Sequence, residues 1–271
     1  TDLCGGHPAT GVPTATCNSL LRNGLLGYSH HVVLAGTETG NPLIVARDQP
    51  RTLSALFSAP ISGPTDGLVV CYTFNADSGG AVLDSSGNGN DGYLVGNVTY
   101  EDSIYGKAPR FTSRDTYIVS GGAGLNGNGW PGLTVSAWID KKAYTTYGTI
   151  FNRGSLIGTT AGTFLMNTRA DWVGAQFGVL TNANGWVALE SGAAPDLNVW
   201  YHYVGVYDGI NLSFYIDGQL IAQVPVAIPN QPLYDEANNK LVIGNLAWEQ
   251  GIHWYDMYFD GLIDEVRIYN R

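Results

Sequence analysis

A loop rich in carboxylates and amides lies in the first half of the chain. Residues 84–92 read DSSGNGNDG, and such residues form turns in which side chains bond their own backbone. The same residue types offer the oxygens that Ca²⁺ binds, about six to eight at a time. The spacing does not match an EF-hand. Two interpretations therefore stay open, a self-bonded turn and a calcium loop.

Two adjacent carboxylates, Asp264 and Glu265, lie in the last apolar run, and paired carboxylates are typical of glycosidases. The run alternates with period two, which predicts a β-strand. Leu262, Asp264 and Val266 are then expected on one face. Because neighbours in a strand point to opposite faces, Asp264 and Glu265 are not expected to act as a catalytic pair.

Residues 247–258 form a second segment with chemical potential, a loop denser in aromatic side chains than a loop needs. Sugars bind to aromatic platforms flanked by polar groups, because a pyranose has an apolar face and a ring of hydroxyls. The loop therefore predicts a glycan site formed by Trp248, His253, Trp254, Tyr255 and Asp256. Packing of these side chains against the rest of the chain, or against another subunit, is the alternative.

Composition limits the class of protein that carries these segments. The 271 residues hold 36 Gly, 16 Tyr and 7 Trp, only 13% are charged, and the formal net charge is -10. Such a composition favours strands joined by turns over helices. The acidic balance argues against nucleic acid as a partner, since phosphates attract clustered Lys and Arg. No apolar run is long enough to predict a membrane span.

The sequence predicts an accessory segment followed by an all-β domain. Residues 1–66 are rich in Gly, Pro and Thr, with one expected helical piece at Asn18–Leu26. From residue 67 onward short apolar runs alternate with turn signals, and Asp217-Gly218 predicts a hairpin whose turn needs positive φ. The expected strands are 68–74, 116–119, 134–139, 149–152, 163–166, 172–179, 186–190, 200–207, 212–216, 220–225, 240–243 and 262–269.

Several of these strand motifs together resemble a known family. Residues 68–75, 82–92, 133–139, 200–209, 212–218, 241–245 and 259–271 follow one another in the order found in laminin-G-like domains of the concanavalin A-like superfamily. The resemblance covers about residues 67–271 and implies a two-sheet antiparallel jelly-roll sandwich. Trp138 and Trp200 are interpreted as core residues of that sandwich, because large aromatic side chains fill such interiors.

The resemblance also bears on metal binding and catalysis. Similar domains often hold calcium between the early loop and the last strand, which implies the ligands Asp84, Asn90, Asp91 and Asp264, followed by Asn75 and Asp77. Enzymes on this sandwich carry three acidic residues in the pattern Glu-x-Asp-x-x-Glu on one strand, and the sequence has no such string. Catalysis is therefore not expected, and a polysaccharide-degrading enzyme is the third choice.

The sequence thus predicts a secreted or cell-surface recognition and adhesion module, stabilised by calcium, whose partner is a glycan or a matrix component. Cys4 and Cys17 are expected to form a disulfide, which leaves Cys71 free and buried. The alternative function is a structural subunit of an extracellular filament, coat or appendage. In that case residues 1–66 would add a strand to a neighbouring copy and make a homo-oligomer.

Overall fold

The computed structural model describes residues 64–77, 79–120, 125–154, 163–169, 174–235, 239–246 and 257–271, together with two short strands before them. The chain divides into two compact units, Thr1–Pro64 and Thr65–Arg271. In the first unit, β1 (Leu20–Leu21) pairs antiparallel with β2 (His30–His31). The helix expected at Asn18–Leu26 is therefore wrong at Leu20 and Leu21; the rest of that segment lies outside the described residues.

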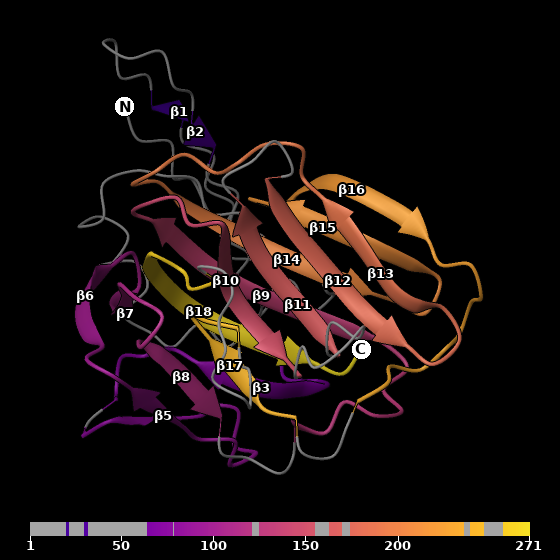
Figure 1. The fold of residues 1–271 in the computed structure, drawn as a ribbon, viewed down its shortest axis with the longest axis horizontal. Coiled ribbons are helices and arrows are strands. Elements are labelled where there is room, and N and C mark those ends of the chain that lie inside the picture. Colours follow the sequence, from indigo (N-terminus) through magenta and orange to yellow (C-terminus); the bar gives the residue numbers. More distant parts are fainter. Residues whose placement is uncertain are drawn as a thin grey trace, which may run out of the picture. The chain divides into compact units, whose positions relative to one another are not determined.

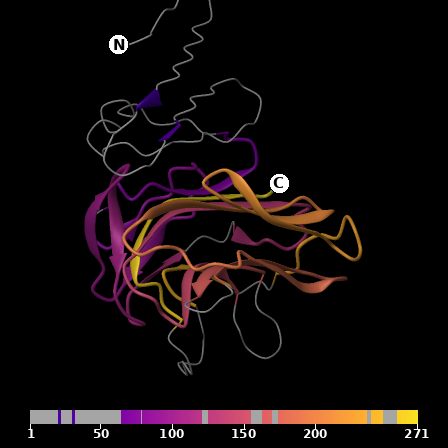
Figure 2. The same ribbon diagram turned by 90° about the horizontal axis from the view of Figure 1, so that it is seen from above.

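The second unit is a sandwich of two antiparallel sheets, which Figure 2 shows as two layers. Sheet I has the order β16-β15-β14-β9-β18-β7-β6, with β3 also paired to β18. Its strands are β3 (Leu68–Tyr72), β6 (Thr99–Ser103), β7 (Gly106–Phe111), β9 (Leu133–Lys141), β14 (Trp200–Tyr207), β15 (Asn211–Ile216), β16 (Gln219–Pro225) and β18 (Gly261–Tyr269).

Sheet II has the order β13-β12-β11-β10-β17-β8-β5-β4 and faces the viewer in Figure 1. Its strands are β4 (Ala81–Val82), β5 (Gly92–Val95), β8 (Tyr117–Ser120), β10 (Tyr147–Arg153), β11 (Phe164–Arg169), β12 (Ala175–Thr181), β13 (Gly185–Glu190) and β17 (Leu241–Ile243). The predicted all-β jelly-roll architecture is confirmed. Asp217 and Gly218 have φ of 50° and 77°, so the predicted turn between β15 and β16 is also confirmed.

Alternate side chains of both sheets meet in one apolar core. Sheet I contributes Val135, Ala137 and Ile139 of β9, and sheet II contributes Phe164 and Met166 of β11. Trp138 and Trp200 occupy the opposite positions of β9 and β14, so they lie on the outer face of sheet I and not in the core. The interior has no room for them, since Gly205 of β14 already packs against the ring of Phe177 from sheet II.

The last strand also departs from its predicted alternation. Ile263 and Val266 both point into the core, although three positions separate them. The register against β9 shifts between Asp264 and Arg267, and Glu265 has a φ of 49°, which together define a β-bulge. The expected face shared by Leu262, Asp264 and Val266 is therefore wrong, because the extra residue moves Val266 to the core.

Candidate functional site

The outer face of sheet II carries a row of polar side chains across four strands. Thr149 of β10 lies opposite Asn167 of β11, which lies opposite Gln176 of β12, which lies opposite Glu190 of β13. These residues alternate with core residues such as Met166 and Phe177, so they point away from the core. With strands about 4.8 Å apart, the row extends about 14 Å across the sheet.

Two buried amides on this face have polar atoms without a partner among the residues that the structure describes. Asn152 of β10 is fully buried, and within those residues its Oδ1 accepts no hydrogen bond and its Nδ2 donates none. The Oδ1 of Asn167, which is 3% exposed, is also unpartnered, while its Nδ2 is 3.4 Å from Oε1 of Gln176. Leaving a buried polar group unpaired costs about 1–3 kcal/mol.

An aromatic side chain lies beside these amides. Trp186 of β13 is half-buried, and its indole packs on Gly178 of β12 so closely that a Cβ at that glycine would lie 2.3 Å from Cζ2. Gly178 pairs with Leu165, and Leu165 pairs with Asn152, so the indole and the free amides share one face. Unpaired amides next to an indole are the combination that binds a sugar ring.

The ends of the predicted aromatic loop are attached at the same place. Gly244 donates to the carbonyl of Ile150 at 2.9 Å, and Thr149 donates to the carbonyl of Met257 at 3.2 Å. The segment 247–256 thus leaves and rejoins sheet II beside β10. The predicted ligand residues Trp248, His253, Trp254, Tyr255 and Asp256 lie outside the described residues, as do Cys4 and Cys17.

The fold and this face can now be compared with known proteins. The laminin-G model of the concanavalin A-like lectin/glucanases superfamily matches residues 111–271. The chain belongs to this family. The resemblance predicted from the strand motifs is thereby confirmed. Comparison with curated protein sequences gives no match.

Solved structures share the fold of this laminin-G-like chain at low identity. The binding domain of Paraclostridial Mosquitocidal Protein 1 aligns with a TM-score of 0.58 and 14% identity, covering 76% of this chain and 49% of that one. Domain 4 of AbnA, an extracellular GH43 arabinanase from Geobacillus stearothermophilus solved with arabinotriose, aligns with a TM-score of 0.56 and 23% identity, covering 74% and 91%. The botulinum neurotoxin serotype G binding domain aligns at 0.55 and 12%, covering 75% and 48%. The laminin-G-like chain spans about half the length of the two toxin binding domains.

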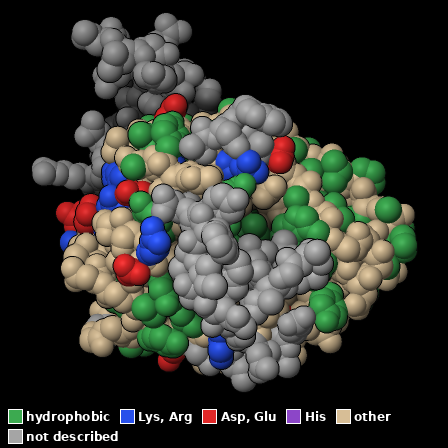
Figure 3. All heavy atoms as spheres, in the orientation of Figure 1, with side chains coloured by type: hydrophobic (Ala, Val, Ile, Leu, Met, Phe, Trp, Pro, Cys, Tyr) green, Lys and Arg blue, Asp and Glu red, His purple; other side chains and the backbone are tan. Residues whose placement is uncertain are grey.

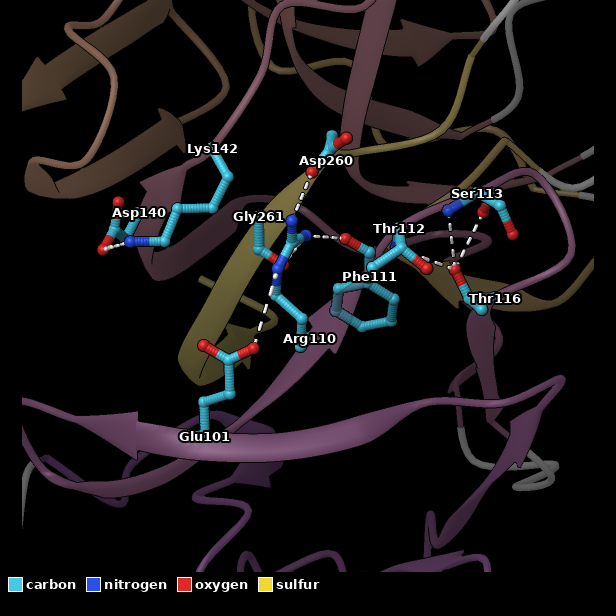
Figure 4. A network of polar contacts seen from close by, with 10 residues as sticks. All are labelled: Glu101, Arg110, Phe111, Thr112, Ser113, Thr116, Asp140, Lys142, Asp260 and Gly261. Atoms are coloured by element: carbon cyan, nitrogen blue, oxygen red, sulfur yellow. Dashed lines mark hydrogen bonds and ion pairs between the residues drawn. The ribbon is translucent and has the colours of Figure 1, made fainter.

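The outer face of sheet I differs from that of sheet II, since its polar side chains mostly bond one another. Figure 4 shows Arg110 of β7 donating to Oδ1 of Asp260 at 2.6 Å, with Glu101 3.8 Å away on its other side. Lys142 donates to Oδ2 of Asp140 at 2.7 Å in the same view. This face of the laminin-G-like domain offers few free polar groups to a ligand.

The carboxylates of the last strand belong to this sheet I face. Asp264 is fully buried and accepts hydrogen bonds from Oγ of Ser103 and from the backbone N–H of Glu265. Burial raises the pKa of Asp264 to about 7. Glu265 instead pairs with Arg267 at 2.8 Å. The two carboxylates therefore have separate partners.

An aromatic stack covers the strands beside Asp264. The rings of Trp138 and His202 stack with centroids 4.9 Å apart, and Tyr105 meets Trp138 edge-on at 5.5 Å. Burial, and then the charge of Arg267, lower the pKa of His202 to about 4, so this imidazole is neutral at pH 7. A neutral, stacked histidine fits a packing role.

The proposed calcium ligands are only partly brought together. The Asp84 loop is closed by its own bonds: Oδ1 accepts from the N–H groups of Cys71 and Ser86, and Oδ2 accepts from Ser86 Oγ and Asn90 N–H. Asp91 accepts from the N–H of Asp84 at 2.7 Å. Cys71 itself is buried and free, as predicted.

The other expected calcium ligands are engaged elsewhere. Asp77 accepts from Tyr100, Asn75 bonds Tyr105 and Lys107, and Asp264 bonds Ser103. No group of three His, Cys, Asp or Glu side chains suited to a metal occurs among the residues that the structure describes. One observation fits an ion, the buried and unpartnered Oδ1 of Asn90. Calcium therefore stays a prediction.

Sequence reasoning missed Asn152, Asn167 and Gln176. Each interrupts an otherwise apolar strand at an outward position, and Asn is disfavoured in strands. This mismatch between residue type and strand was the sequence feature that could have identified them. Trp186 of β13 and Tyr147 of β10 are aromatic residues that the structure describes on the same outer face.

Proposed function

We propose that residues 65–271 form a non-catalytic recognition module that binds carbohydrate on the outer face of sheet II. The observation that carries this proposal is a set of three buried amide atoms without a partner among the described residues: Oδ1 and Nδ2 of Asn152 and Oδ1 of Asn167. Hydroxyls of a sugar can both donate to amide oxygens and accept from amide N–H groups, so they complement both ends of Asn152. The fit removes an energetic cost that the free protein carries.

The indole of Trp186 would supply the apolar contact. A pyranose or furanose ring lying against the half-buried Trp186 places its hydroxyls toward Asn167 and Gln176, whose strands lie between Trp186 and β10. Glu190 at the exposed end of the polar row would accept from a further hydroxyl. The aromatic residues predicted as ligand contacts at 247–256 belong to this proposal as well.

Related structures support the proposal without identifying the sugar. The arabinanase domain was solved with arabinotriose, and the toxin structures are binding domains. Among the described residues, no helix is long and apolar enough to cross a membrane. The glycan or cell-surface partner, the secreted location and the lack of catalysis belong to this proposal, and calcium stabilisation remains a prediction beside it.

A glycan array that includes arabinotriose, followed by titration calorimetry on any sugar bound, tests the site. We expect Trp186→Ala and Asn167→Ala each to weaken binding about tenfold or more, since each removes contacts of about 1–3 kcal/mol. Trp138→Ala is the matched control, because it deletes the same side chain from the outer face of sheet I. The proposal fails if no sugar binds, or if Trp138→Ala weakens binding as much as Trp186→Ala.

A further inference from the structure

One edge of sheet I differs in character from the rest of the surface. Strand β16 is the last strand of its sheet, and within the described residues it pairs only with β15. An edge strand presents unpaired backbone N–H and C=O groups, and proteins usually protect such edges with charges, Pro or bulges. β16 is seven residues long, and its single proline, Pro225, is at its very end; one β-bulge, at Ile221, interrupts its pairing with β15.

Large apolar side chains are exposed along this edge. Leu220 and Ile221 of β16 are 52% and 40% exposed. Ile210 and Ile228 are 50% and 47% exposed, and Ile210 lies beside the end of β16 because its carbonyl accepts from Val226 N–H. We call Ile210, Leu220, Ile221 and Ile228 the β16 patch. Hydrophobic side chains gather at the margin of the molecule where β16 lies (Figure 3).

The same edge lacks charge. Residues 209–234 contain one charged residue, Asp217, and its Oδ1 accepts from the backbone N–H of His202 at 2.8 Å in the turn before β16. The chain as a whole carries a net charge of -10. Because the chain as a whole is acidic, we expect this neutral apolar edge to be covered by a binding partner.

We propose that the occupant is β16 of a second copy of this chain, paired antiparallel about a two-fold axis near Ala222. Two copies of an acidic protein repel each other over most of their surfaces, and this repulsion is smallest where both surfaces are neutral. A basic partner would instead be drawn to acidic regions. Only another free strand satisfies the edge backbone groups, and a second copy supplies one with the same exposed apolar side chains.

The pairing would join two copies of sheet I into one continuous sheet and bury the two β16 patches together. A two-fold contact of this kind closes on itself, so it yields a dimer and no larger species. It leaves the outer face of sheet II free, because that face belongs to the other layer of the sandwich. Dimerisation would therefore present two proposed sugar sites in one particle and raise avidity for clustered glycans.

Sedimentation velocity of the full chain over about a hundredfold range of concentration tests the proposal. We expect a monomer–dimer equilibrium that strengthens with added NaCl, because salt screens the repulsion between the two acidic copies. Ile221→Lys should weaken the dimer about tenfold or more, since it places two like charges diagonally across the new strand pair, where each Ile221 faces Gln223 of the other copy. Leu220→Lys provides a second variant, and thermal unfolding checks that both still fold.

The matched control is Tyr93→Lys, which adds the same charge at a residue 51% exposed on β5 of the other sheet. It should leave the dimer unchanged. A monomer at every concentration, or Ile221→Lys associating like the original chain, would overturn the proposal. Growth beyond the dimer would also overturn it and would favour assembly through residues 1–66 of a neighbouring copy.

Discussion

Two consecutive residues of β10, Asn152 and Arg153, are both buried and polar, yet they differ in what they contact. Arg153 points inward, and its Nε donates to Oδ2 of Asp235 at 2.8 Å. Asp235 also accepts from Thr163 Oγ1, Gly127 N–H and Asn239 Nδ2. Asn152 points outward, and its amide contacts no hydrogen-bonding partner.

The difference shows where the protein uses polar side chains for folding and where it keeps them for a ligand. The Asp235 network ties together segments around residues 127, 153, 163 and 239, so each of its bonds fixes the sheet II framework. Within the described residues the amide of Asn152 forms no such bond, and that of Asn167 forms one, from its Nδ2 to Gln176. A buried group that is costly to fold and supports no other residue is best explained by a partner outside the chain.

The largest effect on stability is expected in the Asp235 network, where the buried polar groups have partners. Asp235→Ala should lower the free energy of unfolding by about 3–5 kcal/mol, because it leaves the buried Arg153 guanidinium without its counter-charge. Urea unfolding followed by circular dichroism measures the change. Asp115→Ala, at an exposed carboxylate, should stay within about 0.5 kcal/mol and serves as control. Equal effects of the two substitutions would show that the network does not hold the framework.

Lys141 is an intermediate case, a buried charge with one hydrogen-bond partner. Its Nζ is fully buried, donates to Thr168 Oγ1 and lies 5.5 Å from the ring centroid of Phe259. Burial lowers the pKa of Lys141 from 10.5 to about 8, against the opposing charge of Asp260. Gly148 is required here, because a Cβ would lie 2.5 Å from Nζ.

Lys141→Met should therefore stabilise the protein at pH 7, by about 1–3 kcal/mol. The unfolded chain keeps the lysine proton up to about pH 10.5, while the folded chain loses it near pH 8. In that window the unfolded state binds more protons, so the stability of the original chain rises with pH. The variant should lack this rise. Urea unfolding at pH 7 and at pH 10 decides; a parallel pH dependence in both proteins would contradict the assignment.

A smaller effect separates two asparagines of the same sheet. Asn245 is 2% exposed, and its amide donates to the carbonyl of Arg114 at 2.6 Å and accepts from Leu246 N–H at 2.8 Å. Asn245→Leu should destabilise the protein by about 1–3 kcal/mol, because it leaves the Arg114 carbonyl and the Leu246 N–H without their hydrogen-bond partner. Asn152→Leu should leave stability unchanged or raise it by about 1 kcal/mol, and should abolish sugar binding. Thermal unfolding of both variants tests this prediction. It is wrong if Asn152→Leu lowers stability more than Asn245→Leu does.

The sequence predicted where the strands lie better than which face of each strand is buried. Strand 200–207 was predicted with its observed bounds, since six of its eight residues are Trp, Tyr or Val. β6 and β7 were missed, because Glu101, Asp102 and Lys107 dilute their apolar pattern. Period two shows that a strand has two faces but not which one is buried, so Trp138 was placed in the core where Ala137 lies.

The candidate site was predictable only in part. The aromatic loop was singled out by composition, and its ends do meet the face with the free amides. The sequence marks Asn152 and Asn167 only as polar residues in apolar strands, because whether their amides find partners depends on contacts between strands. The bulge at Glu265 was equally invisible, since no glycine or proline marks it.

The smallest effect concerns the early loop, where Asp84 is paired and the Oδ1 of Asn90 is not. If calcium binds there, adding it raises the melting temperature by a few degrees, because a ligand that binds only the folded state stabilises it. A chelator should reverse the rise, and magnesium should not replace calcium, because it demands tighter octahedral geometry. Differential scanning calorimetry in calcium, magnesium and chelator measures all three. Identical melting temperatures would reject calcium. Asp84→Ala would then destabilise the protein equally with and without chelator, because the four hydrogen bonds that Asp84 accepts hold the loop in either case.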